Sequence, residues 1–173
     1  DNHTIRQLNL ATGMVTTLAG MAGTPGSADG NGTTASFNTP YGVVSDGQGR
    51  LFVADTGNHT VRQVVMASRA VSTPAGLAGN PGSTNGIAGM ARFNRPMGIA
   101  WDGAGSLWIC DSANGTLRRL LPGSGTVSTA PIEKRRRKST SSGLGPSSPV
   151  GTPIGSNAMP HFGQSPGESR TIS

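Results

Sequence analysis

Residues 55–63 read "DTGNHTVRQ", and this phrase occurs three times in the chain. It returns as "DNHTIRQ" at residues 1–7 and as "DSANGTLRR" at residues 111–119. Asn2, Asn58 and Asn114 are therefore separated by a constant offset of 56 residues (58 − 2 and 114 − 58). A fixed period of this size indicates a repeat architecture, in which each copy forms one supersecondary unit.

The rest of the unit keeps the same offset from residue 1 to about residue 131. "PGSADG" at 25–30 matches "PGSTNG" at 81–86, and "FNTPYG" at 37–42 matches "FNRPMG" at 93–98. "DGQGRLFVAD" at 46–55 matches "DGAGSLWICD" at 102–111 without a gap. The copies are thus structural equivalents, and a residue in one can be compared directly with its counterpart in the next.

Each full unit is expected to contain four short strands. In the second copy they are residues 42–46, 50–55, 60–66 and 70–74, because apolar positions alternate there between Gly- and Asn-rich turns. Four antiparallel strands per repeat are typical of one propeller blade. The sequence predicts an all-β protein with half a blade at 1–20, a blade at 37–76 and a blade at 93–130.

The motif D-x-x-N-H-x-[IV]-R, preceded by P-x-G-[VI]-x-x-D-x-x-G-x-L-[FW]-[VI], resembles the NHL repeat. The resemblance covers residues 1–131 and implies a β-propeller, often six-bladed. A closed ring needs about 4–8 blades, whereas this chain holds two and a half. Two interpretations follow: the chain is a piece of a longer propeller, or a short chain that completes its ring by oligomerising.

Composition separates a folded part from a tail. The chain has 173 residues, 27 of them Gly and 12 Pro, one Cys, and no apolar run near the length of a membrane span. Residues 1–132 carry eight Arg and six Asp, whereas the tail is more basic for its length and rich in Ser, Gly and Pro. We expect residues 132–173 to be a disordered tail.

The basic cluster of the tail consists of Lys134, Arg135, Arg136, Arg137 and Lys138. It resembles a nuclear-localisation or anionic-surface patch, and the alternative is a solvated linker. Weak electrostatic contact with nucleic acid would be possible through it. It favours cytoplasm or nucleus, although a secreted protein is not excluded.

The repeated polar residues are expected to serve the turns. Asp55 and Asp111 can accept hydrogen bonds from N–H groups about two residues further on, and Asn58 and Asn114 suit left-handed backbone. Arg62 and Arg118 are expected to pair with these Asp residues across a blade boundary. The alternative is a row of arginines presented to an acidic partner.

Neither a metal site nor a cofactor is expected. His59 is replaced by Gly115 in the next copy, and one His per blade does not converge on a metal. Cys110 stands in an apolar strand where the previous copy has Ala54, so it is expected to be buried. Phe37, Phe93 and Trp108 are expected in the core between blades.

The long connections between blades, about 19–39 and 75–95, are expected to dominate one face together with the turns after each second strand. Binding surfaces are commonly built from such loops, and the alternative is that they pack on each other and cover blade edges. Candidate binding residues are Asp29, Asn31, Asn85 and Trp101.

These observations favour a non-catalytic module that binds a protein partner. Two alternatives stay open. A propeller enzyme of the lactonase or lyase type would need metal ligands from several blades, and residues 1–132 contain no Glu. A nucleic-acid-binding propeller would need a basic folded face.

Overall fold

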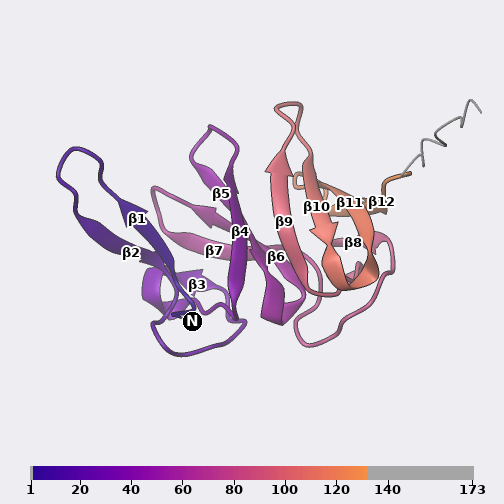
Figure 1. Ribbon diagram of the computed structural model, residues 1–173, viewed down its shortest axis with the longest axis horizontal. Helices are drawn as coiled ribbons and strands as arrows, with labels where there is room; N and C mark the ends of the chain where they lie inside the picture. The colour runs from indigo at the N-terminus through magenta and orange to yellow at the C-terminus, as the bar shows by residue number, and fades with distance from the viewer. Residues whose placement is uncertain (1, 132–173) are drawn as a thin grey trace, which may run out of the picture. The chain divides into compact units, whose positions relative to one another are not determined.

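The computed structural model describes residues 2–131, which form three antiparallel sheets (Figure 1). The first is a hairpin of β1 (Ile5–Leu8) and β2 (Val15–Ala19). The second has the order β3-β7-β6-β5-β4 and the third the order β8-β12-β11-β10-β9. The prediction of an all-β protein built from antiparallel blades is confirmed.

Four strands of the second sheet follow one another along the chain. They are β4 (Pro40–Ser45), β5 (Arg50–Asp55), β6 (Thr60–Val65) and β7 (Ala70–Ala75). Their counterparts in the third sheet are β9 (Pro96–Trp101), β10 (Leu107–Asp111), β11 (Thr116–Leu121) and β12 (Thr126–Thr129). The first strand of each set begins at a proline, where the missing N–H is tolerated.

Each of these two sheets also has a fifth strand that the sequence did not predict. Strand β3 (Gly30–Asn31) pairs with β7, and β8 (Gly86–Ile87) pairs with β12. Both lie in the connections that precede their own sheets. Four 3-10 turns complete the described part: η1 (Gly32–Thr34), η2 (Thr56–Asn58), η3 (Ala88–Met90) and η4 (Ser112–Asn114).

The core lies between successive sheets. One cluster joins the second and third sheets and includes Phe52, Phe93 and Ile109, all fully buried. A second cluster joins the first hairpin to the second sheet through Leu18, Phe37 and Val53. Phe37 and Phe93 thus lie in the core, as the sequence predicts.

One face of the third sheet has no described strand packed on it. Phe52 is buried under the third sheet, whereas its counterpart Trp108 is only half-buried. Ala54 is fully buried, whereas its counterpart Cys110 is exposed. The expected burial of Cys110 and full burial of Trp108 are therefore wrong, because both expectations required a further sheet over β10.

Within residues 2–131 no helix is long and apolar enough to cross a membrane. The predicted tail at 132–173, with its basic cluster, lies outside the described residues.

Candidate functional site

Two connections, residues 20–39 and 76–95, run along the outer rim of the second and third sheets; we refer to them as the first and second strap. Strand β3 of the first strap pairs Gly30 with Val71, and β8 of the second pairs Gly86 with Val127. This pairing covers the free edges of β7 and β12, which would otherwise present open N–H and C=O groups. The connections therefore cover blade edges, as the alternative expected, and this covering does not by itself decide whether their outer sides bind a partner.

The straps and the turns after the second strands occupy one side of the described sheets. In Figure 1 the connections into β3, β4 and β9 run along the lower side, and the β4–β5 and β9–β10 turns stand at the upper side. The N–H of Gly57 in η2 donates to the carbonyl of Asn38 in the first strap, at 2.8 Å. The first strap and the η2 turn are therefore bound to each other.

Arg62 fixes the first strap from beneath. Its Nη1 donates to the Asp55 carboxylate and to the Ser36 carbonyl, both at 2.9 Å. Its Nη2 donates to the Ala28 carbonyl at 2.9 Å and to Asp29 Oδ1 at 2.8 Å. The guanidinium also lies 5.0 Å from the centre of the Phe37 ring. One buried cation thus holds the strap at three residues.

The same arrangement recurs in the third sheet. Arg118 donates to the Asp111 carboxylate at 2.9 Å, and to the carbonyls of Arg92 and Thr84. Its fourth partner is Asn85 Oδ1 at 2.9 Å, which takes the place of Asp29. Recurrence at the repeat period shows that the motif arginine anchors a strap.

The predicted partners of the arginines were right and their predicted placement was wrong. Arg62 and Asp55 lie on adjacent strands β6 and β5 of one sheet, so the pair does not cross a blade boundary. Arg62 and Arg118 are fully buried, which excludes a row of these two side chains presented to an acidic partner. Arg6, their counterpart in the first hairpin, is exposed.

The motif Asp also reaches the strap. Asp55 Oδ1 accepts the Asn38 N–H at 2.8 Å, from a residue 17 positions earlier and not from its own turn as expected. Burial raises the pKa of Asp55, against the hydrogen bonds from Asn38, Asn58 and Arg62 that lower it. Asp111 accepts the Asn94 N–H in the same way, at 2.7 Å.

The motif Asn closes the network. Nδ2 of Asn58 donates to Asp55 Oδ2 and to the Gly26 carbonyl, both at 2.7 Å. Nδ2 of Asn114 makes the equivalent bonds with Asp111 and Gly82. The left-handed residue is not the Asn but the one after it, since His59 has φ 60° and Gly115 has φ 62°.

The histidines link successive sheets. Nδ1 of His59 accepts the N–H of Arg95 at 3.0 Å, and Nδ1 of His3 accepts the N–H of Thr39 at 3.1 Å. The hydroxyl of Thr56 donates to the Pro96 carbonyl, at 2.6 Å, across the same boundary. Within residues 2–131 no group of three or more His, Cys, Asp or Glu side chains is placed to hold a metal ion.

Trp101 packs between the second and third sheets. Its ring stacks on Phe52 with 6.0 Å between centroids and an interplanar angle of 7°. Its counterpart Ser45 is exposed. Trp101 breaks the pattern in order to cover Phe52 of the preceding sheet, but it is only partly buried, and contact of its exposed part with a partner stays a prediction.

The remaining candidate binding residues lie on the outer side of the straps. Asn31 and Asn85 are exposed, although Asn85 Oδ1 accepts from Arg118 and Thr129. The Asp29 side chain is half exposed, and it accepts from Arg62 and Thr73. Asp29 and Asn85 therefore help to hold the straps in place and are also accessible at the surface.

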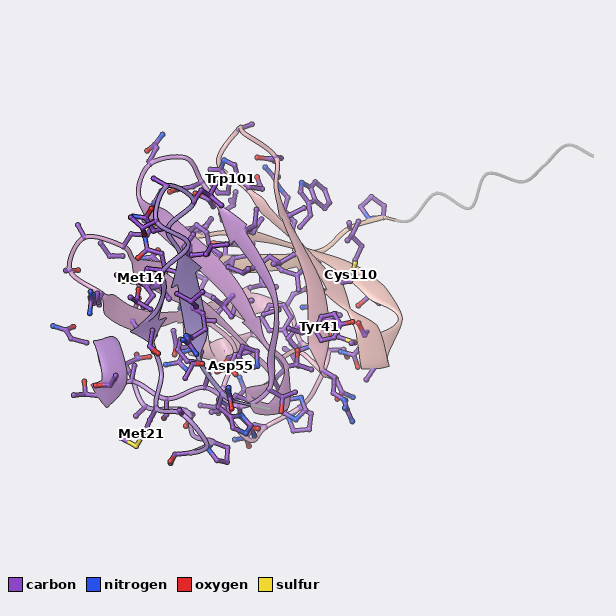
Figure 2. All side chains as sticks on the ribbon, turned by 60° about the vertical axis from the view of Figure 1, so that its left-hand side comes forward. Met14, Met21, Tyr41, Asp55, Trp101 and Cys110 are labelled. Atoms are coloured by element: carbon purple, nitrogen blue, oxygen red, sulfur yellow. The ribbon has the colours of Figure 1, made fainter. Side chains whose placement is uncertain are left out.

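The straps also expose apolar side chains that the sequence analysis did not single out: Met21 (48% exposed), Leu77 (42%), Ile87 (57%) and Met90 (73%). Figure 2 shows Met21 at the lower periphery, directed away from the body of the protein, while Asp55 lies within it. Met21 and Leu77 occupy the same position of the repeat (77 − 21 = 56). Because both positions are apolar within segments rich in Gly and Pro, the sequence repeat alone could have identified this exposed apolar position.

Comparison with known proteins agrees with the fold. The NHL repeat family model matches residues 37–64. The chain is 28% identical over 144 residues to NHL repeat-containing protein 2 of Gallus gallus, covering 76% of this chain and 19% of that protein. It is 43% identical over 63 residues to Protein SUPPRESSOR OF QUENCHING 1, chloroplastic, of Arabidopsis thaliana, covering 36% of this chain and 6% of that protein. The chain therefore spans less than a fifth of these relatives.

Solved structures superpose on the described sheets. A structural genomics protein of unknown function from Bacteroides thetaiotaomicron is 25% identical, with a TM-score of 0.64 and coverage of 68% of this chain and 30% of that chain. An auxiliary nutrient binding protein from Bacteroides ovatus is 24% identical, with a TM-score of 0.59 and coverage of 75% and 33%, a likeness of fold alone. The 56-residue period, the recurring Asp–Asn–Arg network and these matches together support an NHL-repeat family, and the sheets have the form of β-propeller blades.

Proposed function

We propose that this part of the propeller is a non-catalytic module that recognises a protein partner through the face formed by the two straps and the η2 and η4 turns. The observation that carries the proposal is the anchoring of the straps. Each is tied from beneath by one buried arginine and one asparagine, and it presents exposed polar and apolar side chains outward. Loops fixed on a rigid scaffold are the usual location of binding residues.

The buried charges favour a structural role over catalysis. The buried charged residues of 2–131 are Asp46, Asp55, Arg62, Asp111 and Arg118. Asp46 closes its own turn, and the other four hold straps. The carboxylates and the arginine Nη atoms are thus committed to protein partners, and only the buried Nε atoms of Arg62 and Arg118 lack one, which leaves these residues poorly placed to act on a substrate.

The test is a comparison of two surface variants of the full chain. Met21→Ser/Leu77→Ser alters the strap face. Leu10→Ser/Met14→Ser alters exposed residues of the β1–β2 hairpin, where Figure 2 shows Met14 apart from Met21. Quantitative affinity capture from the source cells should yield proteins that the hairpin variant retains and the strap variant loses. Capture that is lost with the hairpin variant alone, or with neither, contradicts recognition through the strap face.

A further inference from the structure

The two straps are built alike but are not alike on their surfaces. In both, a glycine N–H pairs with the core phenylalanine carbonyl: Gly26 with Phe37, and Gly82 with Phe93, each at 3.0 Å. The arginine anchors are also equivalent, as described above. Differences between the straps on their outer sides are therefore not imposed by the fold.

The second strap is the more apolar of the two. Ile87 stands at the position of Asn31, and Met90 at the position of Thr34; Ile87 and Met90 are 57% and 73% exposed. Thr34 Oγ1 accepts the N–H of Asn31 and donates to the carbonyl of the same residue. A Met side chain cannot make either hydrogen bond, so Met90 stabilises the turn less than Thr34 does. A residue that lowers local stability in this way points to a role other than folding.

These side chains gather around η3. Ile87 precedes the turn and Met90 is its last residue, and the N–H of Gly76, next to Leu77, donates to the Ala88 carbonyl of η3 at 3.2 Å. The backbone beside Leu77 is thus hydrogen-bonded to η3, and we refer to the exposed apolar side chains of Leu77, Ile87 and Met90 as the η3 patch. Met side chains suit such surfaces because they adapt to the shape of a partner.

The second strap also differs in charge. Residues 20–39 contain Asp29 and no basic residue, whereas residues 76–95 contain Arg92 and Arg95 and no acidic residue. The formal charge thus changes from −1 to +2 between equivalent segments. Arg92 Nη1 donates to the Ala91 carbonyl just after η3, which places its guanidinium beside the patch, and Arg95 is exposed.

We propose that the η3 patch, with Arg92 and Arg95, binds a short acidic amphipathic segment of a partner protein. The apolar side of that segment covers Leu77, Ile87 and Met90, and its carboxylates pair with the two arginines. Arg95 is five residues from Met90, at most about 17 Å along an extended chain, so a helix of about 12 residues, roughly 18 Å long, spans both. The inference rests on the proposed function and names the partner's chemistry.

The same observations argue against two other occupants. Nucleic-acid binding depends on many phosphate contacts and on exposed aromatic stacking platforms, and the patch has two arginines and no aromatic side chain. A lipid surface gains about 1 kcal/mol for each basic residue near it, which makes two arginines a weak attachment. Both are nevertheless measured in the test.

The test uses the full chain and three labelled 16-residue peptides in fluorescence anisotropy at 150 mM salt. One peptide combines Glu and Leu at helical spacing, one has Ser in place of Leu, and one has Lys in place of Glu. Only the Glu/Leu peptide should bind through the η3 patch. Ile87→Asn/Met90→Thr, which installs the residues of the first strap, should weaken its binding at least about tenfold. Arg92→Ser/Arg95→Thr should weaken it and remove its salt dependence at this site.

The first strap supplies a gain-of-function control. The combined variant Asp29→Asn, Asn31→Ile, Thr34→Met, Ser36→Arg and Thr39→Arg should raise the stoichiometry from one Glu/Leu peptide per chain to two. The inference is overturned if the Lys/Leu peptide binds equally well, or if Ile87→Asn/Met90→Thr leaves binding unchanged. It is also overturned if that variant instead abolishes binding to phosphatidylserine vesicles or oligo(dT).

Failure of this inference is distinguishable from failure of the proposed function. If the strap face captures a protein and the Glu/Leu peptide does not bind, the chemistry assigned to the partner is wrong and recognition through the straps stands. If the peptide binds the η3 patch but Met21→Ser/Leu77→Ser captures the same proteins as the unaltered chain, the patch has the assigned chemistry and the captured proteins are held elsewhere, so the proposed function fails.

Discussion

Arg62 Nη1 lies 2.9 Å from Asp55 Oδ2, and the two side chains are 1% and 0% exposed. Both residues also bind the first strap, Arg62 through carbonyl oxygens and Asp55 through the Asn38 N–H. The ion pair is therefore the point at which a strand, a turn and a distant connection are held together. Removal of the ion pair should loosen the first strap more than it loosens the sheet.

Arg62→Leu should lower the free energy of unfolding by about 3–5 kcal/mol, because it leaves the Asp55 carboxylate buried without its cation. Urea denaturation of the full chain measures the change. Arg119→Leu is the matched control, since Arg119 is exposed on β11 and donates only to Ser106 Oγ, and it should cost less than about 1 kcal/mol. Equal effects of the two variants would contradict the role assigned to Arg62.

Gly76→Ala should be more destabilising than Gly79→Ala, although both glycines have positive φ, 95° and 72°. A Cβ on Gly76 would lie 2.7 Å from the His59 carbonyl oxygen and 2.9 Å from Thr60 Cα, whereas nothing lies within 4 Å of a Cβ on Gly79. We expect about 1 kcal/mol for Gly79→Ala from backbone strain alone, and clearly more for Gly76→Ala. Thermal unfolding of the two variants provides the comparison, and the reverse order would show that the contact is easily relieved.

The turn at Asp46 should make stability depend on pH. Burial raises the pKa of Asp46, but the Gln48 N–H, the Arg50 side chain and the Arg50 N–H outweigh it, so the pKa lies below its ordinary value. The native carboxyl then binds protons less readily than the unfolded one, so its stabilising contribution is complete above about pH 4 and is lost as pH falls through the native pKa.

Unfolding of the unaltered chain and of Asp46→Asn between pH 2 and pH 7 measures this contribution as a difference. The difference should be constant near neutral pH and should shrink in acid. A difference that grows as the pH falls would reverse the sign and exclude the assignment.

Cys110 should react readily with Ellman's reagent in the native chain, because it lies exposed on the uncovered side of β10 (Figure 2). The double variant Ala54→Cys/Cys110→Ala moves the thiol to the equivalent position of the second sheet, where Ala54 is 0% exposed. That thiol should react more slowly, since reaction requires access. Equal rates at the two positions would mean that the third sheet does not cover β5 in solution.

The sequence predicts the four main strands of each blade well. Their alternating apolar residues are a local signal, and this signal recurs in each copy at the 56-residue period. The fifth strands escaped prediction, since β3 and β8 are two residues long and pair with strands about 40 residues further on. Such pairs carry no periodic signal. The stacking of Trp101 on Phe52 was missed for a related reason, because Phe52 lies in another sheet.

The motif residues were assigned correctly to structure and the Arg–Asp pairs were predicted, but the backbone N–H groups that the Asp residues bind were not. Local rules place an Asp's acceptor bonds within its own turn, whereas Asp55 binds Asn38 across 17 residues. The exposed apolar residues of the second strap became visible only when the two copies were compared on the structure. Asn31 and Ile87 occupy equivalent positions, as do Thr34 and Met90. The fold therefore accepts either a polar or an apolar residue at each of these positions.

Because an arginine and an asparagine fix each strap from within, the outward residues of the two rim segments can diverge independently. A mutation at Ile87 need not disturb the neighbouring copy, and one at Asn31 leaves the second undisturbed. Such a protein can change the surface chemistry of its rim one module at a time, with its internal scaffold unchanged.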